Sequence, residues 1–225
     1  MALDISRVKG LCFDVDGTLN DTDDQFVEQA APFFKPFRFL LPGRDPVRAA
    51  RRFVMWVEAP GNFLMGVPDH YGFDDQISKI VSWINQRRKA RIRHFRPIPG
   101  IQEMLSRLSE HYPLSVVSAR DEATTREFLR QAGIEQYFTC AAGAMTVKHT
   151  KPYPDPIFWA AEKMGVSPAD CLMIGDTTVD IRAGRAAGSQ TVGVLCGFGE
   201  EAELRRRGAD EILLNTPMLA ELLLG

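Results

Sequence analysis

The stretch LCFDVDGTLND, residues 11–21, decides the fold and raises the first chemical question. A short apolar run ends there in Asp14 and Asp16, and Gly17 and Thr18 follow directly. Successive side chains of a strand point to opposite faces, so two aspartates that lie two positions apart share a face. Their mutual repulsion is costly unless a positive group lies between them. The rest of the chain has to supply that group.

Apolar strand-like runs alternate with amphipathic helical segments over the C-terminal two thirds of the chain. Strands are expected over residues 8–13, 114–117, 139–142, 171–174, 191–195 and 211–213. Helices are expected over residues 101–108, 122–131, 156–164, 179–187, 200–207 and 217–224. This alternation predicts an α/β fold with a doubly wound parallel sheet. Ligands of such sheets bind at the carboxyl ends of the strands.

The segment over residues 19–95 interrupts the alternation. It holds six prolines and no strand-like run, and an apolar stripe from Ile77 to Ile84 has helical spacing. Between Lys35 and Arg96 there are 13 Lys+Arg and 5 Asp+Glu, a net charge of +8 within a chain of net charge −2. We therefore expect two domains, an α/β core formed by residues 1–18 and 96–225 and a mostly helical cap over residues 19–95.

Composition and cysteine usage narrow the class of partner and the compartment. The net charge of −2 provides no global attraction to nucleic acid or to a membrane surface. No window approaches the ~18 apolar residues of a membrane span, and the start MALDISRVKG lacks the apolar stretch of a secretory signal. We expect a cytoplasmic protein with a small-molecule partner, no nucleic acid and no membrane. Buried free thiols are predicted for the widely spaced Cys12, Cys140, Cys171 and Cys196.

Polar side chains follow four of the predicted strands. They are Asp14 and Asp16 after the first strand, Ser118 after the second, Lys151 in the loop after the third, and Asp176 and Asp180 after the fourth. The carboxyl ends of parallel strands share one edge of the sheet, so these side chains should converge. Clustered carboxylates ionise together only beside a cation, and Mg²⁺ prefers such oxygen ligands. A lysine and a hydroxyl beside a metal describe a phosphate site, since they bind the outer phosphate oxygens.

The order of these motifs resembles the haloacid dehalogenase-like (HAD) superfamily. DVDGTL at residues 14–19 comes first, then Ser118 and Lys151, and then GDTTVD at residues 175–180. The chain looks most like the phosphoglycolate phosphatase-like members with a helical cap inserted after the first motif, and the resemblance spans nearly its whole length. It implies a Rossmann-like core, Mg²⁺ as cofactor, and hydrolysis of a small phosphate monoester through an aspartyl-phosphate.

The resemblance also implies a role for each motif residue. Asp14 would be the nucleophile, Asp16 the general acid and then the general base, and Lys151 would offset the charge of Asp14. The implied metal ligands are Asp14, Asp16 through its backbone carbonyl, Asp176 and Asp180. The implied phosphate-binding residues are Gly17, Ser118, Ala119 and Lys151, and Thr18 would brace the loop. An acid at Asp16 favours phosphoryl chemistry over dehalogenation, because a halide leaving group needs no proton.

Other interpretations stay open for single residues and for the whole chain. Asp176 and Asp180 could be N-terminal acids of a helix, Ser118 a helix-entry hydroxyl, Lys151 a solvated loop lysine, and Arg120 could face either substrate or solvent. Asn20 and Asp21 are expected to shape the junction with the insert. A phosphomutase on the same scaffold and a catalytically idle binding module are the alternatives to a phosphatase.

The basic insert generates a hypothesis about the substrate. A cap of net charge +8 favours a small substrate with negative charge beyond its phosphate, such as phosphoglycolate. The alternative is that residues 87–96 form only a solvated basic helix face.

Overall fold

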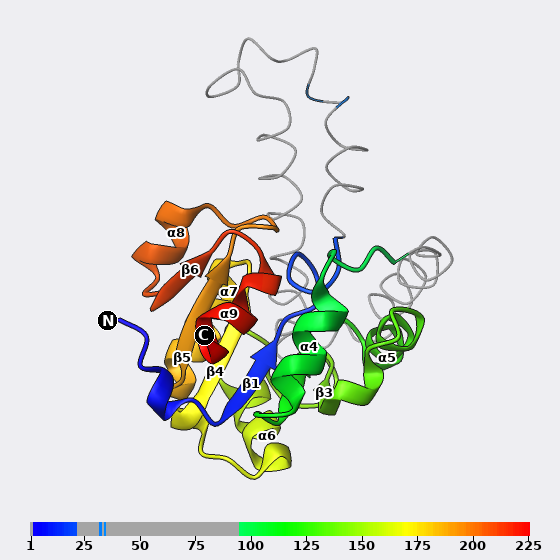
Figure 1. The fold of residues 1–225 in the computed structure, drawn as a ribbon, viewed down its shortest axis with the longest axis horizontal. Coiled ribbons are helices and arrows are strands. Elements are labelled where there is room, and N and C mark those ends of the chain that lie inside the picture. Colours follow the sequence, from blue (N-terminus) through cyan, green and yellow to red (C-terminus); the bar gives the residue numbers. More distant parts are fainter. Residues whose placement is uncertain (1, 22–31, 33, 35–94) are drawn as a thin grey trace, which may run out of the picture. The chain divides into compact units, whose positions relative to one another are not determined.

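The structure is a computed structural model of the 225-residue chain and describes residues 2–21, 32, 34 and 95–225 (Figure 1). The chain divides into two units, one formed by Met1–Thr22 and Phe95–Gly225 and the other by Asp23–His94. Most of the expected cap over residues 19–95, including its apolar stripe, lies outside the described residues; only residues 19–21, 32, 34 and 95 of it are described. The proposed domain boundaries and the helical character of the insert therefore stay predictions.

A six-stranded parallel sheet forms the centre of the described unit. Its strand order is β3-β2-β1-β4-β5-β6. The strands are β1 (Gly10–Phe13), β2 (Leu114–Val117), β3 (Phe138–Ala142), β4 (Cys171–Gly175), β5 (Gln190–Val194) and β6 (Glu211–Leu213). The chain builds outward from β1 through β2 and β3, and then returns to the other side of β1 to form β4. Such a reversal is where doubly wound sheets bind ligands, and the predicted fold class is confirmed.

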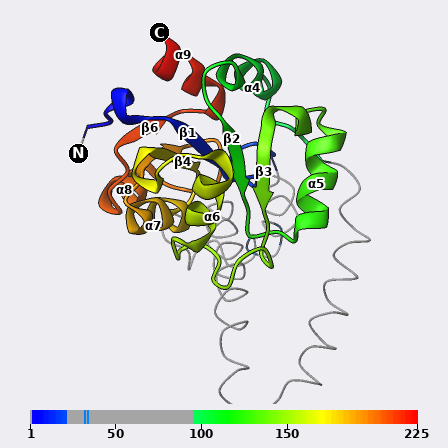
Figure 2. The same ribbon diagram turned by 90° about the horizontal axis from the view of Figure 1, so that it is seen from below.

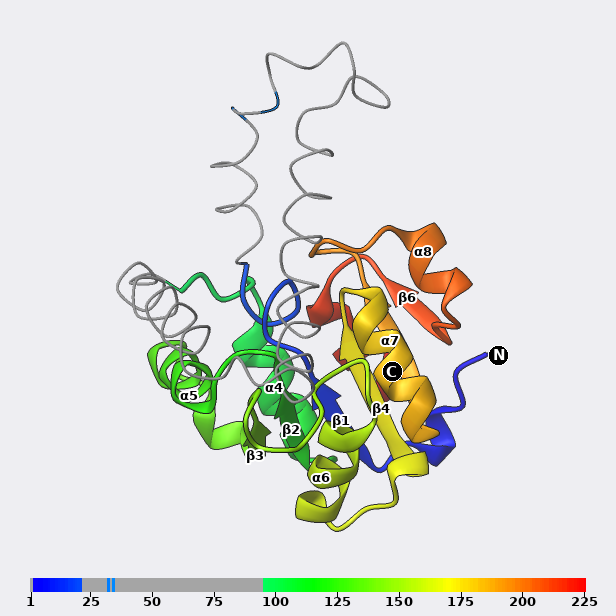
Figure 3. The same ribbon diagram turned by 180° about the vertical axis from the view of Figure 1, so that it is seen from behind.

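Helices cover both faces of this sheet. They are α4 (Ile101–Ser109), α5 (Glu122–Gln131), α6 (Asp155–Met164), α7 (Thr178–Ala187), α8 (Glu201–Arg206) and α9 (Leu219–Leu224), with short 3₁₀ turns η1 (Ile5–Arg7), η5 (Glu135–Tyr137), η6 (Pro168–Asp170) and η7 (Thr216–Met218). Figure 2 shows α4 and α9 on one side of the sheet and α6 and α7 on the other. Figure 3 shows α6 and α7 from their own side. The strands and helices expected for the α/β core are all present, with ends that differ by at most two residues.

Two apolar clusters fill the space between the sheet and the helices. Leu11 and Phe13 of β1 belong to the cluster that includes α4 and α9, whereas Cys12 belongs to the cluster that includes α6 and α7. This division follows from the alternation of side chains along a strand. Strands β1, β2, β4 and β5 are buried at every residue, which explains their continuous apolar runs.

Local sequence signals explain where the helices begin and end. Asp121 starts α5, because its side chain accepts a hydrogen bond from the backbone N–H of Thr124 at 3.0 Å. Helices α6 and α7 end at Gly165 and Gly188, which adopt the left-handed conformation that favours glycine. The expected final helix over residues 217–224 begins instead as the 3₁₀ turn η7 and continues as α9.

All four cysteines are free thiols, but only two of them are buried. Cys12 and Cys171 are buried, whereas Cys140 and Cys196 are half-buried. The prediction of burial was wrong for Cys140 because β3 lies at the edge of the sheet, and for Cys196 because it lies in the loop after β5. Burial raises the pKa of Cys140 to about 11, so this thiol stays protonated at neutral pH.

Among the described residues, no helix combines the length and the apolar character needed to cross a membrane.

Asn20 ties together the two chain segments that flank the insert. Its side-chain Oδ1 accepts a hydrogen bond from the backbone N–H of Arg96 at 2.8 Å, and the N–H of Asp21 donates to the Arg96 carbonyl at 2.7 Å. The N–H of Ile98 donates to the Leu19 carbonyl at 3.0 Å. The chain therefore leaves and re-enters the core through paired backbone, as expected for Asn20 and Asp21 at this junction.

We predict that Asn20→Ala lowers the free energy of unfolding by about 1–2 kcal/mol, because a buried side-chain bond to the backbone is lost. Denaturant titration monitored by circular dichroism would measure this. Asn215→Ala is the control, since the Asn215 amide makes a longer bond, 3.3 Å to the N–H of Met218, at an exposed position. Equal losses for the two variants would contradict a special role of Asn20 at the junction.

Candidate active site

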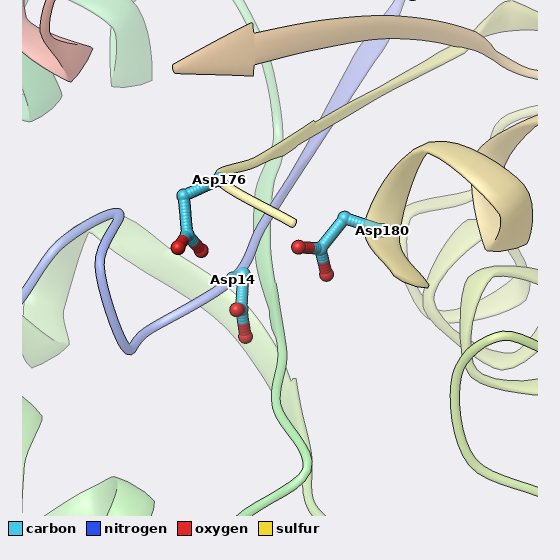
Figure 4. Close-up of side chains that lie close together, drawn as sticks. All are labelled: Asp14, Asp176 and Asp180. Atoms are coloured by element: carbon cyan, nitrogen blue, oxygen red, sulfur yellow. The ribbon is translucent and has the colours of Figure 1, made fainter. Parts of the chain in front are cut away.

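Backbone pairing between β1 and β4 sets the position of the first aspartate. The N–H of Asp14 donates to the Ile174 carbonyl at 2.9 Å, so Asp14 stands at the carboxyl end of β1, beside β4. Asp176 follows the last residue of β4, and Asp180 lies in the first turn of α7. The three carboxylates lie close together, with one ligand oxygen of each within 4.8 Å of the others (Figure 4).

Lys151 is the positive group that the acidic motif requires. Its Nζ lies 2.7 Å from Asp14 Oδ1 and 2.7 Å from Asp180 Oδ1, and the side chain is only 4% exposed. A solvated loop lysine is therefore ruled out. Burial alone would lower the pKa of Lys151, but the charges and hydrogen bonds of the two aspartates raise it above its usual value. The ammonium therefore stays charged.

One ammonium does not balance the acids around it. The pKa of Asp14 is raised to about 7, chiefly by burial and also by the charges of Asp180 and Asp16, while Lys151 acts in the opposite direction. Three clustered carboxylates and one ammonium leave two negative charges, which is the charge that one divalent cation neutralises. The oxygen ligands and the missing charge together fit Mg²⁺.

The hydrogen bonds of Asp180 distinguish it from the other two acids. Its Oδ1 accepts from Lys151 at 2.7 Å, and its Oδ2 accepts from the N–H and the hydroxyl of Thr177 at 3.0 and 2.7 Å. Asp180 is thus at once the helix-capping acid and a member of the site, so the two interpretations of this residue hold together. Both oxygens of Asp180 therefore accept hydrogen bonds from within the protein.

The loop after β5 encloses Asp176. The N–H of Phe198 donates to Asp176 Oδ2 at 2.8 Å, and the Thr18 hydroxyl lies 3.4 Å from Oδ1. A Cβ on Gly197 would collide with the Asp176 carboxylate, and a Cβ on Gly199 would collide with its backbone oxygen. Glycine at these positions therefore lets the loop hold the carboxylate in place. Sequence reasoning missed this loop, although the CGFG run directly after a predicted strand was a usable signal.

The loop that follows Asp14 is braced from the C-terminal part of the chain. Gly17 has φ of +71°, a conformation that favours glycine, and the Cys196 thiol donates to its carbonyl at 3.3 Å. The Thr216 hydroxyl donates to the Thr18 carbonyl at 2.6 Å. Thr18 is fully buried, and through its contact with Asp176 it connects the loop to the acid cluster.

Ser118 and Ala119 lie in the loop between β2 and α5, at the same edge of the sheet. The N–H of Ser118 donates to the Ala142 carbonyl at 2.9 Å, and its hydroxyl accepts from the N–H of Arg120 at 3.1 Å. Ser118 is 5% exposed, whereas Ala119 is exposed. Because Asp121 caps α5, Ser118 is not its helix-entry hydroxyl.

Arg120 binds the second aspartate of the motif. Its Nε and Nη2 donate to Asp16 Oδ2 and Oδ1, so the guanidinium contacts both oxygens of the carboxylate. The guanidinium also lies 5.5 Å from the centre of the Phe95 ring. The contact with Asp16 is neither of the two interpretations of Arg120, which were that it faces the substrate or the solvent. Asp16 is not one of the three acids that converge around Lys151.

Comparison with known proteins agrees with this geometry. Residues 11–194 match the sequence profile of the family described as haloacid dehalogenase-like hydrolase. The chain is 29% identical to a phosphoglycolate phosphatase of Neisseria meningitidis, with 96% of this chain and 94% of that protein covered. It is 26% identical to the pyrophosphatase PpaX of Bacillus pumilus, with 90% of each chain covered. A haloacid dehalogenase-like hydrolase from Streptococcus pneumoniae matches its structure with a TM-score of 0.69 at 26% identity, covering 98% of this chain and 100% of that one.

A buried set of acids and one lysine, at the carboxyl ends of parallel strands, fits a site that binds a phosphate group. The chain belongs to the haloacid dehalogenase-like hydrolases, as the match over most of its length shows. The motifs predicted a phosphatase of this superfamily. The family match and the named relatives confirm that prediction and the enzyme class, a phosphatase.

We predict that Gly197→Ala weakens Mg²⁺ binding by about 10-fold or more, because the added methyl group displaces the Asp176 carboxylate. Isothermal titration of the metal-free protein with MgCl₂ would measure the change. Gly10→Ala is the control, since its methyl group would also meet crowded side chains, Val166 at 3.0 Å and Met164 at 3.2 Å, but at the opposite end of β1. Loss of affinity in both variants would mean that general destabilisation is the cause.

The buried charge of Asp14 predicts a pH-dependent stability of the metal-free protein. The pKa of Asp14 in the folded protein is raised to about 7, so the folded state favours the protonated side chain. This contribution to stability is fully present below pH ~4 and is lost as the pH rises through about 7. Asparagine does not ionise. We therefore expect Asp14→Asn to be more stable than the wild type at pH 8, by at most about 4 kcal/mol, with the difference vanishing near pH 4.

Thermal unfolding in EDTA at several pH values would test this expectation. Glu221→Gln removes an exposed carboxylate and serves as the control, because it should show no such dependence. A stability difference for Asp14→Asn that is the same at every pH would contradict the account.

Proposed function

We propose that the protein is a Mg²⁺-dependent phosphatase that hydrolyses a small phosphate monoester through an aspartyl-phosphate on Asp14. The observation that supports this most strongly is the position of Lys151, 2.7 Å from Asp14 within a buried cluster of acids. This arrangement suits a carboxylate that must approach an anionic phosphoryl group, because the lysine offsets the repulsion between them.

In the first step an oxygen of Asp14 attacks phosphorus, and the ester P–O bond breaks as the new P–O bond to Asp14 forms. Ser118, the backbone near Ala119 and Gly17, and Lys151 hold the outer phosphoryl oxygens. Asp16 donates a proton to the departing alkoxide. The leaving group departs as a neutral alcohol, and the phosphoryl group remains on the enzyme.

In the second step water attacks the aspartyl-phosphate, and Asp16 accepts a proton from that water. The P–O bond to Asp14 breaks, inorganic phosphate is released, and the carboxylate of Asp14 is regenerated. One residue acts first as acid and then as base, because the second step reverses the direction of proton transfer.

Asp14 and Asp176 would hold Mg²⁺ directly, together with the backbone carbonyl of Asp16, and Asp180 would support the site through Lys151. When bound, the ion supplies positive charge to the developing negative charge on the phosphoryl oxygens. The chain's own part is to place Asp176 through the loop at residues 197–199 and to keep water from the buried carboxylates.

For the substrate we propose a small phosphorylated acid of the phosphoglycolate type. Support comes from the net charge of +8 between Lys35 and Arg96 and from the similarity to the Neisseria protein, which is named a phosphoglycolate phosphatase. We further propose a cytoplasmic enzyme, for which four free thiols are the supporting observation. The pyrophosphatase relative supports inorganic pyrophosphate as a second candidate substrate.

We expect the purified protein to release phosphate from 2-phosphoglycolate with Mg²⁺ and to lose this activity in EDTA. Asp14→Asn should lower kcat by at least about a thousand-fold, because the nucleophile is removed. A malachite green assay measures both, with Glu221→Gln as a matched control that removes one exposed carboxylate.

Activity that survives Asp14→Asn would remove the proposed nucleophile. Hydrolysis of pyrophosphate in preference to 2-phosphoglycolate would favour the second candidate. Turnover that requires a sugar bisphosphate would instead identify a phosphomutase.

A further inference from the structure

The C-terminal part of the chain reaches the active site although it lies outside the sequence that matches the family. That match covers residues 11–194. Beyond it, Thr216 of η7 is fully buried, and its hydroxyl donates to the Thr18 carbonyl at 2.6 Å. The bond joins positions 198 residues apart in the sequence. The loop that follows Asp14 is thus held by a segment that carries none of the catalytic motifs.

The turn η7 is itself held by the core. Asn215 caps its start, because the Asn215 side chain accepts a hydrogen bond from the N–H of Met218 at 3.3 Å, and its end continues directly into α9. A Cβ on Gly100 would lie 3.3 Å from the side chain of Pro217, so the turn packs closely against the start of α4. The Thr216 hydroxyl therefore acts from a packed part of the core.

Thr18 passes this constraint on to one of the proposed metal ligands. Its own hydroxyl is buried and lies 3.4 Å from Asp176 Oδ1. A hydrogen bond of that length is near the limit of the usual range, so a small movement of Thr18 away from Asp176 would break it. Thr216 restricts that movement, because its bond of 2.6 Å holds the Thr18 carbonyl. Two hydroxyl groups thus connect η7 to the carboxylate.

The two oxygens of Asp176 are contacted by groups from different loops. Oδ2 accepts from the N–H of Phe198 at 2.8 Å, whereas Oδ1 faces the Thr18 hydroxyl. Groups that orient a metal ligand tune the affinity for the metal, and their removal typically weakens binding by about 10–100-fold. Loss of the contact at Oδ1 would therefore remove one of the groups that orient this carboxylate.

We propose that Thr216 is a positioning residue of the Mg²⁺ site, which holds Thr18 and through the Thr18 hydroxyl sets the orientation of Asp176. The inference rests on the proposed function, since it concerns the ion that this function requires. It assigns a role in metal binding to a turn outside the family match. Loss of one hydroxyl should then weaken Mg²⁺ binding, although neither a charge nor a ligand is removed.

Isothermal titration of the metal-free protein with MgCl₂ tests this without turnover. Thr216→Val removes the hydroxyl and keeps the shape of the side chain, and it should weaken Mg²⁺ binding by about 10-fold. Thr216→Ser keeps the hydroxyl and should bind Mg²⁺ nearly as well as the wild type. Thr191→Val is the matched control and should keep the wild-type affinity. Thr191 is also fully buried, and its hydroxyl bonds Asp210 at 3.2 Å, but it lies near the amino end of β5, away from the site.

A double-variant cycle tests whether Thr216 acts through Thr18. Thr18→Val removes the contact with Asp176, so adding Thr216→Val to it should weaken Mg²⁺ binding no further. Independent effects of the two substitutions would instead multiply. If Thr216→Val does not fold, Thr216→Ala, which lacks the hydroxyl and adds no atom in its place, replaces it in both measurements.

Three results would overturn the inference: wild-type Mg²⁺ affinity in Thr216→Val, equal weakening in Thr216→Ser or in Thr191→Val, or effects that multiply in the double variant. A wild type that binds no Mg²⁺ would refute the metal site of the proposed function. A wild type that binds Mg²⁺ with an affinity insensitive to Thr216 would refute only the positioning role.

Discussion

The site depends on a shortage of positive charge among buried acids. Lys151 binds Asp14 and Asp180 at 2.7 Å each, and Asp176 completes a group whose negative charge exceeds that of the lysine by two. Burial, together with the charges of Asp180 and Asp16, raises the pKa of Asp14, so the ionised cluster is costly without a further cation. A divalent ion would offset that cost and would leave Asp14 as a carboxylate, which is the form that would attack phosphorus in the proposed reaction. The same electrostatic imbalance would therefore serve both metal binding and reactivity.

The sheet makes this concentration of charge possible. Asp14 and Asp176 meet because β1 and β4 are neighbours in register, and Ser118 lies at the same edge of the sheet because β2 flanks β1 on the other side. Rigid apolar clusters on both faces hold the strand ends in place, while the loop at residues 197–199 and Thr216 fix the polar groups from the C-terminal side. The apolar core on both faces of the sheet stabilises the fold, whereas the buried carboxylates at the site cost stability. Active sites commonly reduce the stability of the fold that carries them.

The sequence predicted those features that follow from strand order. Continuous apolar runs located the strands, and the position of each polar residue after a strand predicted that Asp14, Lys151, Asp176 and Asp180 would meet. The pairing of Arg120 with Asp16 was harder to predict, because it joins loops 104 residues apart and depends on side-chain direction. The enclosure of Asp176 by Gly197 and Gly199 was missed for a similar reason, since a close approach shows itself only when both chains are placed. The sequence left open whether Asp180 is an acid at the start of a helix or a member of the site. The structure shows that it is both.

The most direct test of the charge account is a titration of the metal-free protein with MgCl₂ at pH 7, repeated in two buffers of different ionisation enthalpy. The account predicts one Mg²⁺ bound per chain with release of a fraction of a proton, because Asp14 has a pKa of about 7 and must lose its proton to bind the ion. It also predicts that proton release disappears in Asp14→Asn. Absence of Mg²⁺ binding to the wild type would contradict it. Mg²⁺ binding that releases no proton, and that is unchanged in Asp14→Asn and in Asp176→Asn, would contradict it as well.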